Sequence, residues 1–263
     1  MEKIIFIVGH LIVEMRFQET NIQYGCKKII DGPEITLGGD AYRQAIYCKN
    51  IGINVILLGN VGDDYYGKLI QKALKMAGIS TSYIKEIHNK NTGLSIEICS
   101  QNNQIKRYLS LGANMNDSEF KIPIDYYLHL CNAVIVNKLC NFNLRRQILQ
   151  AAKTNSIPSI YVRSGFPDEE ERNLPIEYLF LDFSEEENVP ISKLDIKSYS
   201  VQKAIFIRKK NEIIALDPTG EECYRTSKEA PLNTNSIISG IIIKLDPRTK
   251  LNDALSFERL FAC

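Results

Sequence analysis

Two short segments near the amino terminus have the side chains and backbone suited to holding a ligand. Glu14 follows the apolar run Ile4–Val8, which predicts a buried first strand. In α/β sheets, ligands bind beyond the carboxyl ends of the strands. Gly38-Gly39 opens a helical stretch, and a glycine pair lets a ligand approach the backbone N–H groups at a helix start. Both segments indicate a ligand site, although the sequence also allows Glu14 to be a solvated carboxylate in a loop.

Arg43 lies four residues after Gly39. Its guanidinium group is a planar fork of donors that matches a carboxylate or a phosphate, so we expect a ligand with an acidic group. A structural alternative stays open, in which Arg43 forms an ion pair with Glu14 or with an acidic group at the surface.

The elements that must position these residues alternate between strands and helices. This order favours a mainly parallel sheet covered by helices on both faces. The predicted strands are Ile4–Val8, Val55–Leu58, Ala133–Val136, Ser159–Val162, Tyr178–Leu181 and Ala204–Ile207. The predicted helices span residues 39–50, 66–76, 144–154 and 191–197. Since no linker or internal repeat divides the chain, we expect a single domain over residues 1–263.

Two segments interrupt the alternation of strands and helices. Residues 27–37 and 92–111 carry apolar residues with strand spacing, which predicts antiparallel strands outside the main sheet. The alternative is an edge hairpin on the main sheet. An exposed apolar edge needs to be covered, so we expect these strands to support a homodimer.

The composition bears on partners and location. Lys and Arg number 32 against 31 Asp and Glu, so there is no electrostatic signal for nucleic-acid binding. The first apolar run is far too short to span a bilayer. The 7 cysteines have no metal-binding spacing, and free thiols are typical of a reducing cytoplasm. We therefore expect a cytoplasmic protein that binds neither nucleic acid nor a membrane.

The order of the motifs resembles that of the ribokinase-like (PfkB-type) carbohydrate kinases. The resemblance rests on Gly38-Gly39, on the stretch from Gly59 to Gly67 with Asp63-Asp64 inside it, and on the segment Arg107–Asn114, which ends in Gly-Ala-Asn. It implies a three-layer α/β sandwich with a small β-lid over the sugar, at residues 27–37 and 92–111. It also implies a dimer contact through that lid.

The family transfers the γ-phosphate of ATP to a sugar hydroxyl with the help of Mg²⁺. The resemblance therefore implies that Glu14, Gly38, Gly39 and Arg43 contact the substrate and that ATP and Mg²⁺ are the cofactors. Arg43 stands where the family has Asn. We therefore expect a small polar metabolite, either a sugar or a sugar acid.

The resemblance weakens in the second half, where the family binds its nucleotide. The family motif Asn-x-x-Glu, which organises magnesium and phosphate, reads Asp182-Phe183-Ser184-Glu185 here. Asp182 still supplies oxygen ligands that suit Mg²⁺, and Glu185 is a candidate metal contact or, alternatively, part of a solvated helix start. Both glycines of the nucleotide loop are replaced in Lys209–Glu212. Lys209 is a candidate phosphate contact or a surface lysine, and the lost glycines count against ATP binding.

The largest departure falls in the catalytic Gly-Ala-Gly-Asp loop of the family. Aligning Gly240 with the downstream glycine of that loop places Asn235 at the catalytic Asp and Leu232-Asn233-Thr234 at the three preceding residues. Thr234 remains a candidate nucleotide contact. An amide has no basic oxygen to accept a hydroxyl proton. Shifting the alignment does not restore the motif, because residues 232–239 contain neither Gly nor Asp.

Two functions fit these observations. The first is a divergent carbohydrate kinase with impaired catalysis. The second is a non-catalytic protein that binds a small metabolite or acts through dimerisation. The retained Glu14 and Gly38-Gly39 favour a ligand under both, whereas the missing Asp and glycines favour the second.

Overall fold

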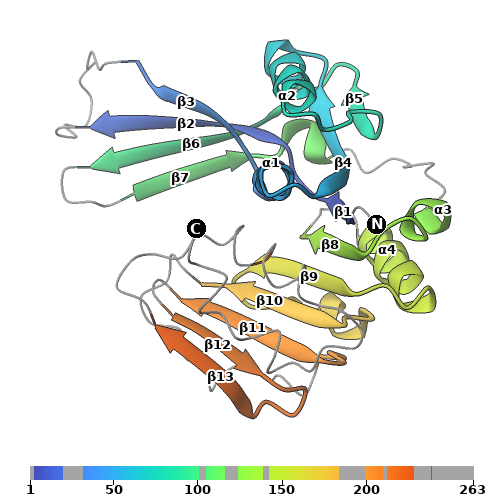
Figure 1. Cartoon of the computed structure of the whole chain (residues 1–263). Coiled ribbons are helices and arrows are strands. Elements are labelled where there is room, and N and C mark those ends of the chain that lie inside the picture. The colour runs from blue at the N-terminus through green and yellow to red at the C-terminus, as the bar shows by residue number, and fades with distance from the viewer. Residues whose placement is uncertain are drawn as a thin grey trace.

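The computed structural model describes residues 3–19, 32–100, 105–115, 124–138, 142–183, 199–209, 212–227 and 238. These residues form a large sheet with helices on it and a smaller sheet that projects from one end (Figure 1). The helix predicted at residues 191–197, part of the segment 27–37, and the candidate residues Glu185, Thr234 and Asn235 lie outside the described residues.

The described residues place nine strands in the large sheet, in the order β13-β12-β11-β10-β9-β8-β1-β4-β5. The strands are β1 (Ile4–Val8), β4 (Asn54–Gly62), β5 (Ile84–Ile87), β8 (Ala133–Asn137), β9 (Ser159–Ser164), β10 (Tyr178–Asp182), β11 (Ala204–Lys209), β12 (Glu212–Leu216) and β13 (Glu222–Ser227). Pairing is parallel from β5 to β11 and antiparallel for β12 and β13. All the predicted strands are present, and β5, β12 and β13 are additions at the two edges.

The strand order reverses at β1. The chain first adds β4 and β5 on one side of β1 and then β8 and β9 on the other. Loops on the two sides of such a reversal diverge, which opens a crevice at the carboxyl end of the strand. The topology therefore places the favoured ligand position at the exit of β1.

Helices cover both faces of the large sheet. Successive residues of β1 point to opposite faces: Ile5 and Ile7 join a buried cluster with helices α1 and α2, whereas Phe6 and Val8 join a cluster with α3 and α4. The helical elements are α1 (Asp40–Asn50), α2 (Tyr65–Met76), α3 (Ile124–Leu128), α4 (Phe142–Thr154) and the 3-10 turns η1 (Gly112–Met115) and η2 (Glu169–Asn173). The three-layer arrangement confirms the predicted fold class. None of the helices described here is both long and apolar enough to cross a membrane.

The smaller sheet, which we call the lid, has the order β3-β2-β6-β7 (Figure 1). Its strands are β2 (Ile12–Glu19), β3 (Glu34–Gly38), β6 (Gly93–Ser100) and β7 (Ile105–Ser110). The described parts of both predicted lid segments lie in this separate sheet, so the edge-hairpin alternative is wrong. The sequence pattern missed β2, which pairs in parallel with β6 and antiparallel with β3.

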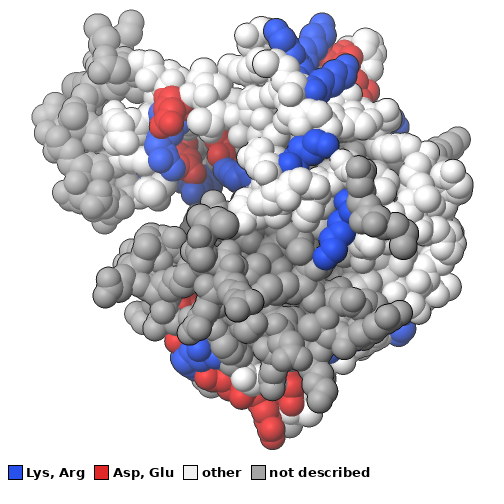
Figure 2. Space-filling view, viewed as in Figure 1, with Lys and Arg blue, Asp and Glu red and all other residues white. Residues whose placement is uncertain are grey.

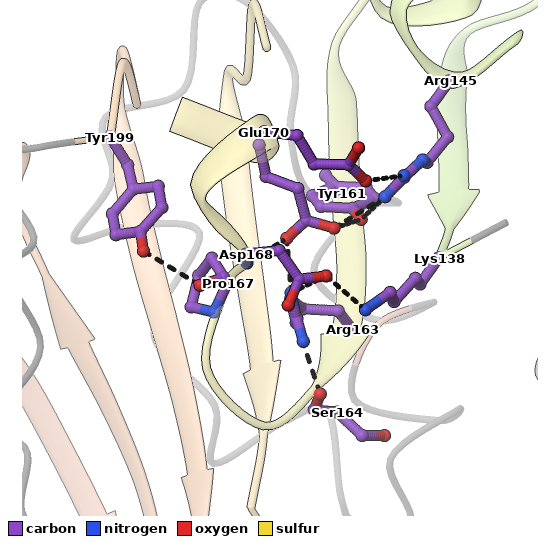
Figure 3. A network of polar contacts seen from close by, with 10 residues as sticks. Lys138, Arg145, Tyr161, Arg163, Ser164, Pro167, Asp168, Glu170 and Tyr199 are labelled. Carbon is purple, nitrogen blue, oxygen red and sulfur yellow. Dashed lines mark hydrogen bonds and ion pairs between the residues drawn. The ribbon is translucent and has the colours of Figure 1, made fainter. Parts of the chain in front are cut away.

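A buried ionic network joins α4, β9 and η2 (Figure 3). Arg145 of α4 and Glu171 of η2 are 1% and 0% exposed. One carboxylate oxygen of Glu171 accepts from Arg145 Nη1 and from the Tyr161 hydroxyl, both at 2.6 Å. The other accepts from Arg163 Nη1 at 2.5 Å. Each buried charge therefore has a partner, as burial of charge requires.

The ionic state of Glu171 depends on these partners. Burial by itself raises the pKa of the carboxyl group, but the hydrogen bond from Tyr161 and the charge of Arg163 hold it below its ordinary value. A carboxyl group with a lowered native pKa stabilises the fold above the pH at which it titrates in the unfolded chain. That contribution is lost as the pH falls through the native pKa.

We predict that Glu171→Gln destabilises the protein by ~3–5 kcal/mol at pH 7, because Arg145 and Arg163 then stay buried without their carboxylate. The measurement is urea unfolding at pH 7 and again at acidic pH, where the difference from the parent protein should shrink. Glu222→Gln is the matched control, since Glu222 pairs with Arg225 at the surface and its loss should change stability little. Equal effects of the two substitutions would contradict a structural role for the buried network.

Candidate functional site

The candidate substrate residues meet at the exit of β1. The register of β2 and β3 sets Ile12 opposite Gly38 and Glu14 opposite Thr36. Helix α1 begins directly after Gly39, so Arg43 lies in the first turns of a helix that starts beside β2. Glu14, Gly38, Gly39 and Arg43 thus come together, although Glu14 lies in a lid strand rather than in a loop.

Glu14 and Arg43 are half-buried and form an ion pair, in which Nη2 of Arg43 donates to both carboxylate oxygens. This is the structural alternative that the sequence left open. Because Glu14 balances the charge of Arg43, Arg43 alone does not argue for an acidic ligand. A Cβ built on Gly38 would lie 2.5 Å from the carboxyl carbon of Glu14, so the pair needs glycine at this position.

Gly39 has a structural requirement of its own. Its φ is +90°, and an added Cβ would collide with the backbone carbonyl of His10. Gly39 is also the N-cap residue of α1 and provides no side chain to cap the helix. The start of α1 therefore packs tightly against the loop after β1. The sequence predicted that a helix starts at this glycine pair, but not that the pair packs against this loop.

A buried pair of amides beneath the site was not predicted. Gln44 of α1 donates to the side-chain oxygen of Asn137 at 2.9 Å and accepts from its nitrogen at 2.8 Å. Asn137 also donates to the carbonyl of Val8 at 3.1 Å. This pair ties α1 to the ends of β1 and β8. In the sequence, the only sign of this pair was Asn137, a polar residue at the end of the apolar run of β8.

The loop after β1 is held from the other side by Asn114 of η1. Its side-chain oxygen accepts from the backbone N–H of Leu11 at 3.3 Å, and its nitrogen donates to the carbonyl of Leu11 at 3.0 Å. Within the described chain, Nε2 of His10 is buried without a hydrogen-bond partner. Burial lowers the pKa of His10 to about 4, so its imidazole is neutral at physiological pH.

Two of the candidate nucleotide residues, Asp182 and Lys209, lie at the carboxyl ends of β10 and β11. Both carboxylate oxygens of Asp182 accept from Arg208 Nη1 at 3.1 Å. The ammonium group of Lys209 is 3.9 Å from the carboxylate of Glu212. Both candidates are therefore ion-paired.

Basic side chains at the ends of β8 and β9 are paired as well. Lys138, next to β8, contacts Asp168 at 2.6 Å, and Arg163 of β9 contacts Asp168 and Glu171 (Figure 3). In the described part of the chain, no group of three or more His, Cys, Asp or Glu residues gathers to hold a metal ion. Among the described residues, the carboxylate that the sequence suggested for Mg²⁺, Asp182, is instead paired with Arg208.

Comparison with known proteins identifies the family. The model of the pfkB family of carbohydrate kinases matches residues 2–234. This chain belongs to that family. Ribokinase of Schizosaccharomyces pombe is 32% identical over 111 residues, which make up 40% of this chain and only 35% of the yeast enzyme.

Solved structures of the family share the fold of this chain. Arabidopsis thaliana ribokinase, complexed with ribose and ATP, has a TM-score of 0.78 at 17% identity, covering 98% of this chain and 90% of the plant enzyme. A Burkholderia thailandensis nucleoside kinase with inosine has a TM-score of 0.70 at 14% identity, covering 90% and 82%. At these identities the likeness establishes the ribokinase-like fold and leaves the ligand of this chain to be argued from its own residues.

We predict that Gly39→Ala destabilises the protein much more than Gly52→Ala. Both glycines have positive φ, at +90° and +81°, but nothing lies within 4 Å of a Cβ built on Gly52. The Gly52 substitution should cost about 1–2 kcal/mol from backbone strain alone. Gly39→Ala adds the collision with the His10 carbonyl. Thermal and urea unfolding of the two variants measure the difference, and equal losses would show that the contact with His10 is unimportant.

Proposed function

We propose that this protein binds a small polar metabolite in the substrate site of the pfkB fold and transfers phosphate to it slowly or not at all. The observation that carries the proposal is a contrast within one chain. The residues at the exit of β1 form a hydrogen-bonded polar site. Glycines stand at the positions where a larger side chain would collide with its neighbours. The residues aligned with the catalytic loop lack the base and the glycines.

The substrate side supports a hydroxyl-rich ligand, a sugar or a sugar acid. A carboxylate such as Glu14 accepts hydrogen bonds from hydroxyl groups, and Arg43 holds that carboxylate in place. The start of α1 adds backbone N–H groups that point out of the helix. The Arabidopsis relative carries ribose and the Burkholderia relative carries inosine, so a sugar ring is the ligand feature shared by these relatives.

The residues aligned with the catalytic loop of the family support impaired catalysis. Phosphoryl transfer to a hydroxyl group needs removal of its proton, and a positioned general base typically contributes about 10²–10⁴ in rate. Asn235 stands at the aligned position and offers an amide. Loss of one donor that stabilises the developing negative charge costs roughly 10²–10³ more, and Leu232-Asn233-Thr234 replaces Gly-Ala-Gly. ATP would supply the phosphoryl group in a competent relative.

We expect sugar-dependent release of ADP to be at least ~10²-fold slower than that of a competent ribokinase measured alongside, because the base is missing. The assay is coupled ADP release with ATP and Mg²⁺ across sugars, sugar acids and nucleosides. Asn235→Asp should not restore turnover, because residues 232–234 are unchanged. Fast turnover by the unmodified protein would refute the impairment, and rescue by Asn235→Asp alone would show that the anion-binding loop is intact.

The lid also supports a homodimer. The strand registers set Ile35, Met15, Ile96 and Tyr108 opposite one another across all four lid strands. This apolar row lies on one face of the lid, and its outer members Ile35 and Tyr108 are exposed. A second copy of the chain covering this face would remove that apolar surface from water.

We predict that Tyr108→Glu converts a dimer to a monomer, because a charge buried in an apolar interface has no partner. Light scattering coupled to size-exclusion chromatography measures the mass. Tyr126→Glu is the matched control, since Tyr126 is equally exposed but lies on α3, outside the lid. A monomeric parent protein, or a Tyr108→Glu variant that stays dimeric, would contradict the lid interface.

A further inference from the structure

Three lysines form a stripe along one side of α2. Lys68, Lys72 and Lys75 are exposed and follow one another at spacings of four and three residues, which places them on the same side of the helix. At 1.5 Å per residue, the stripe spans about 10.5 Å along the helix axis. Figure 2 shows basic side chains gathered over α2 at the top of the view. We call these three residues the lysine stripe.

The lysine stripe lines a groove between α2 and β5. The groove has a volume of about 520 Å³, and its other lining residues are Gln71, Met76 and Glu86. A volume of this size is typical of sites for small molecules. The side chain of Met76 is 79% exposed, and the apolar stems of lysines add to the apolar surface beside it. The groove can therefore contact the uncharged part of a ligand as well as its charges.

The groove has a surplus of positive charge. Three lysines and one acid line it, which leaves two positive charges unbalanced. The acid, Glu86, accepts a hydrogen bond from Gln71 at 3.3 Å. Among the described residues, no acid pairs with any lysine of the stripe. Since the whole chain has a net charge of only +1, this surplus is a local feature of the surface.

The stability of α2 does not explain the stripe. Like charges three and four residues apart weaken a helix, and Lys72 has a lysine on each side at these spacings. Lys75 lies in the last turn, where a cation is favourable, but Lys68 completes the first turn, which holds no acidic residue. A cation at that end opposes the helix dipole. The stripe therefore weakens the helix, and such violations of local rules are expected at functional sites.

We infer that the lysine stripe forms a second ligand site, which binds a molecule carrying a diphosphate or triphosphate group. Lysine ammonium groups bind phosphate as point charges, and three of them along about 10.5 Å of helix can contact more than one phosphate group. Such a group supplies the negative charge that the groove lacks. The site shares no residue with the site at the exit of β1, so the inference goes beyond the proposed function and does not depend on it.

Isothermal titration calorimetry in magnesium-free buffer at low salt tests the site with inorganic phosphate, tripolyphosphate and ATP. Tripolyphosphate and ATP should each bind about tenfold or more tightly than inorganic phosphate, because they carry more negative charge along their length. Added salt should weaken this binding, since it screens exposed charges. Tighter binding of ATP than of tripolyphosphate identifies the ligand as a nucleotide, and the reverse order identifies it as a free polyphosphate.

Variants locate the binding in the groove. Lys68→Gln, Lys72→Gln and Lys75→Gln should each weaken tripolyphosphate binding about two- to fivefold, as expected for the loss of one exposed ion pair. Glu86→Gln should tighten it, because it removes the acid that lines the groove. Lys153→Gln is the matched control, since Lys153 is an exposed lysine in the last turn of α4, and it should leave binding unchanged.

Urea unfolding without ligand shows whether the variants are folded. Lys68→Gln should be at least as stable as the parent protein, because it removes a cation from the first turn of α2. Weaker tripolyphosphate binding by this stable variant then reports the lost contact and not a damaged fold.

Four results would overturn the inference. The first is that neither tripolyphosphate nor ATP binds, and the second is that Lys153→Gln weakens binding as much as the stripe variants do. The third is that the stripe variants bind both ligands as the parent protein does, as expected for binding at the nucleotide position of the family. The fourth is that a polyglutamate peptide binds as tightly as tripolyphosphate and is weakened by the same substitutions, which would make the groove a docking surface for an acidic protein segment. Each of these results leaves the proposed function standing, because that function is tested by sugar binding and ADP release.

Discussion

The close packing of α1 against the exit of β1 is the constraint on which the candidate substrate site depends. Three glycines make it possible, because an added Cβ would meet Asn137 at Gly9, Glu14 at Gly38 and the His10 carbonyl at Gly39. The polar groups that hold this packing together are buried, and hydrogen bonds between Gln44, Asn137 and Val8 satisfy them. Since buried amides are costly when unpaired, the site is held in one arrangement.

Charged side chains are matched by opposite charges both at the sheet edge on the body of the molecule and on the lid. On the body, the basic side chains described at the carboxyl edge of β8–β11 are matched by acids, as in the Arg208–Asp182 pair and in the network around Glu171. On the lid, Glu97 holds two exposed arginines with one carboxylate. Glu34 lies opposite Arg16 in the register of β3 and β2, so two acids match two arginines on the lid as well.

Family membership and activity are separate questions for this chain. The pfkB model matches residues 2–234, and the ribokinase-like fold follows from burial patterns that are spread along most of the chain. The activity of the family depends instead on a few side chains, which the sequence aligns with residues 232–235. In the function that we propose, Asn235 stands where the family has its catalytic Asp, and an amide at that position would supply no general base. The fold establishes the family, whereas the function has to be argued from the residues of the site.

The sequence by itself determined the main strands and the helices α1, α2 and α4, because apolar spacing along a single segment decides which of its faces is buried. It also determined the glycine pair at the start of α1 and the existence of strands outside the main sheet. Only the tertiary structure decided that Glu14 lies in a lid strand, that β2 pairs in parallel with β6, and that Arg43 pairs with Glu14. It likewise decided that Glu97 joins Arg16 to Arg107 and that Glu171 joins Arg145 to Arg163. These pairings link residues far apart in the chain, and local patterns carry no information about which distant charge will balance a buried one. The partner is set by strand register and helix placement, which arise only when the whole sheet has formed.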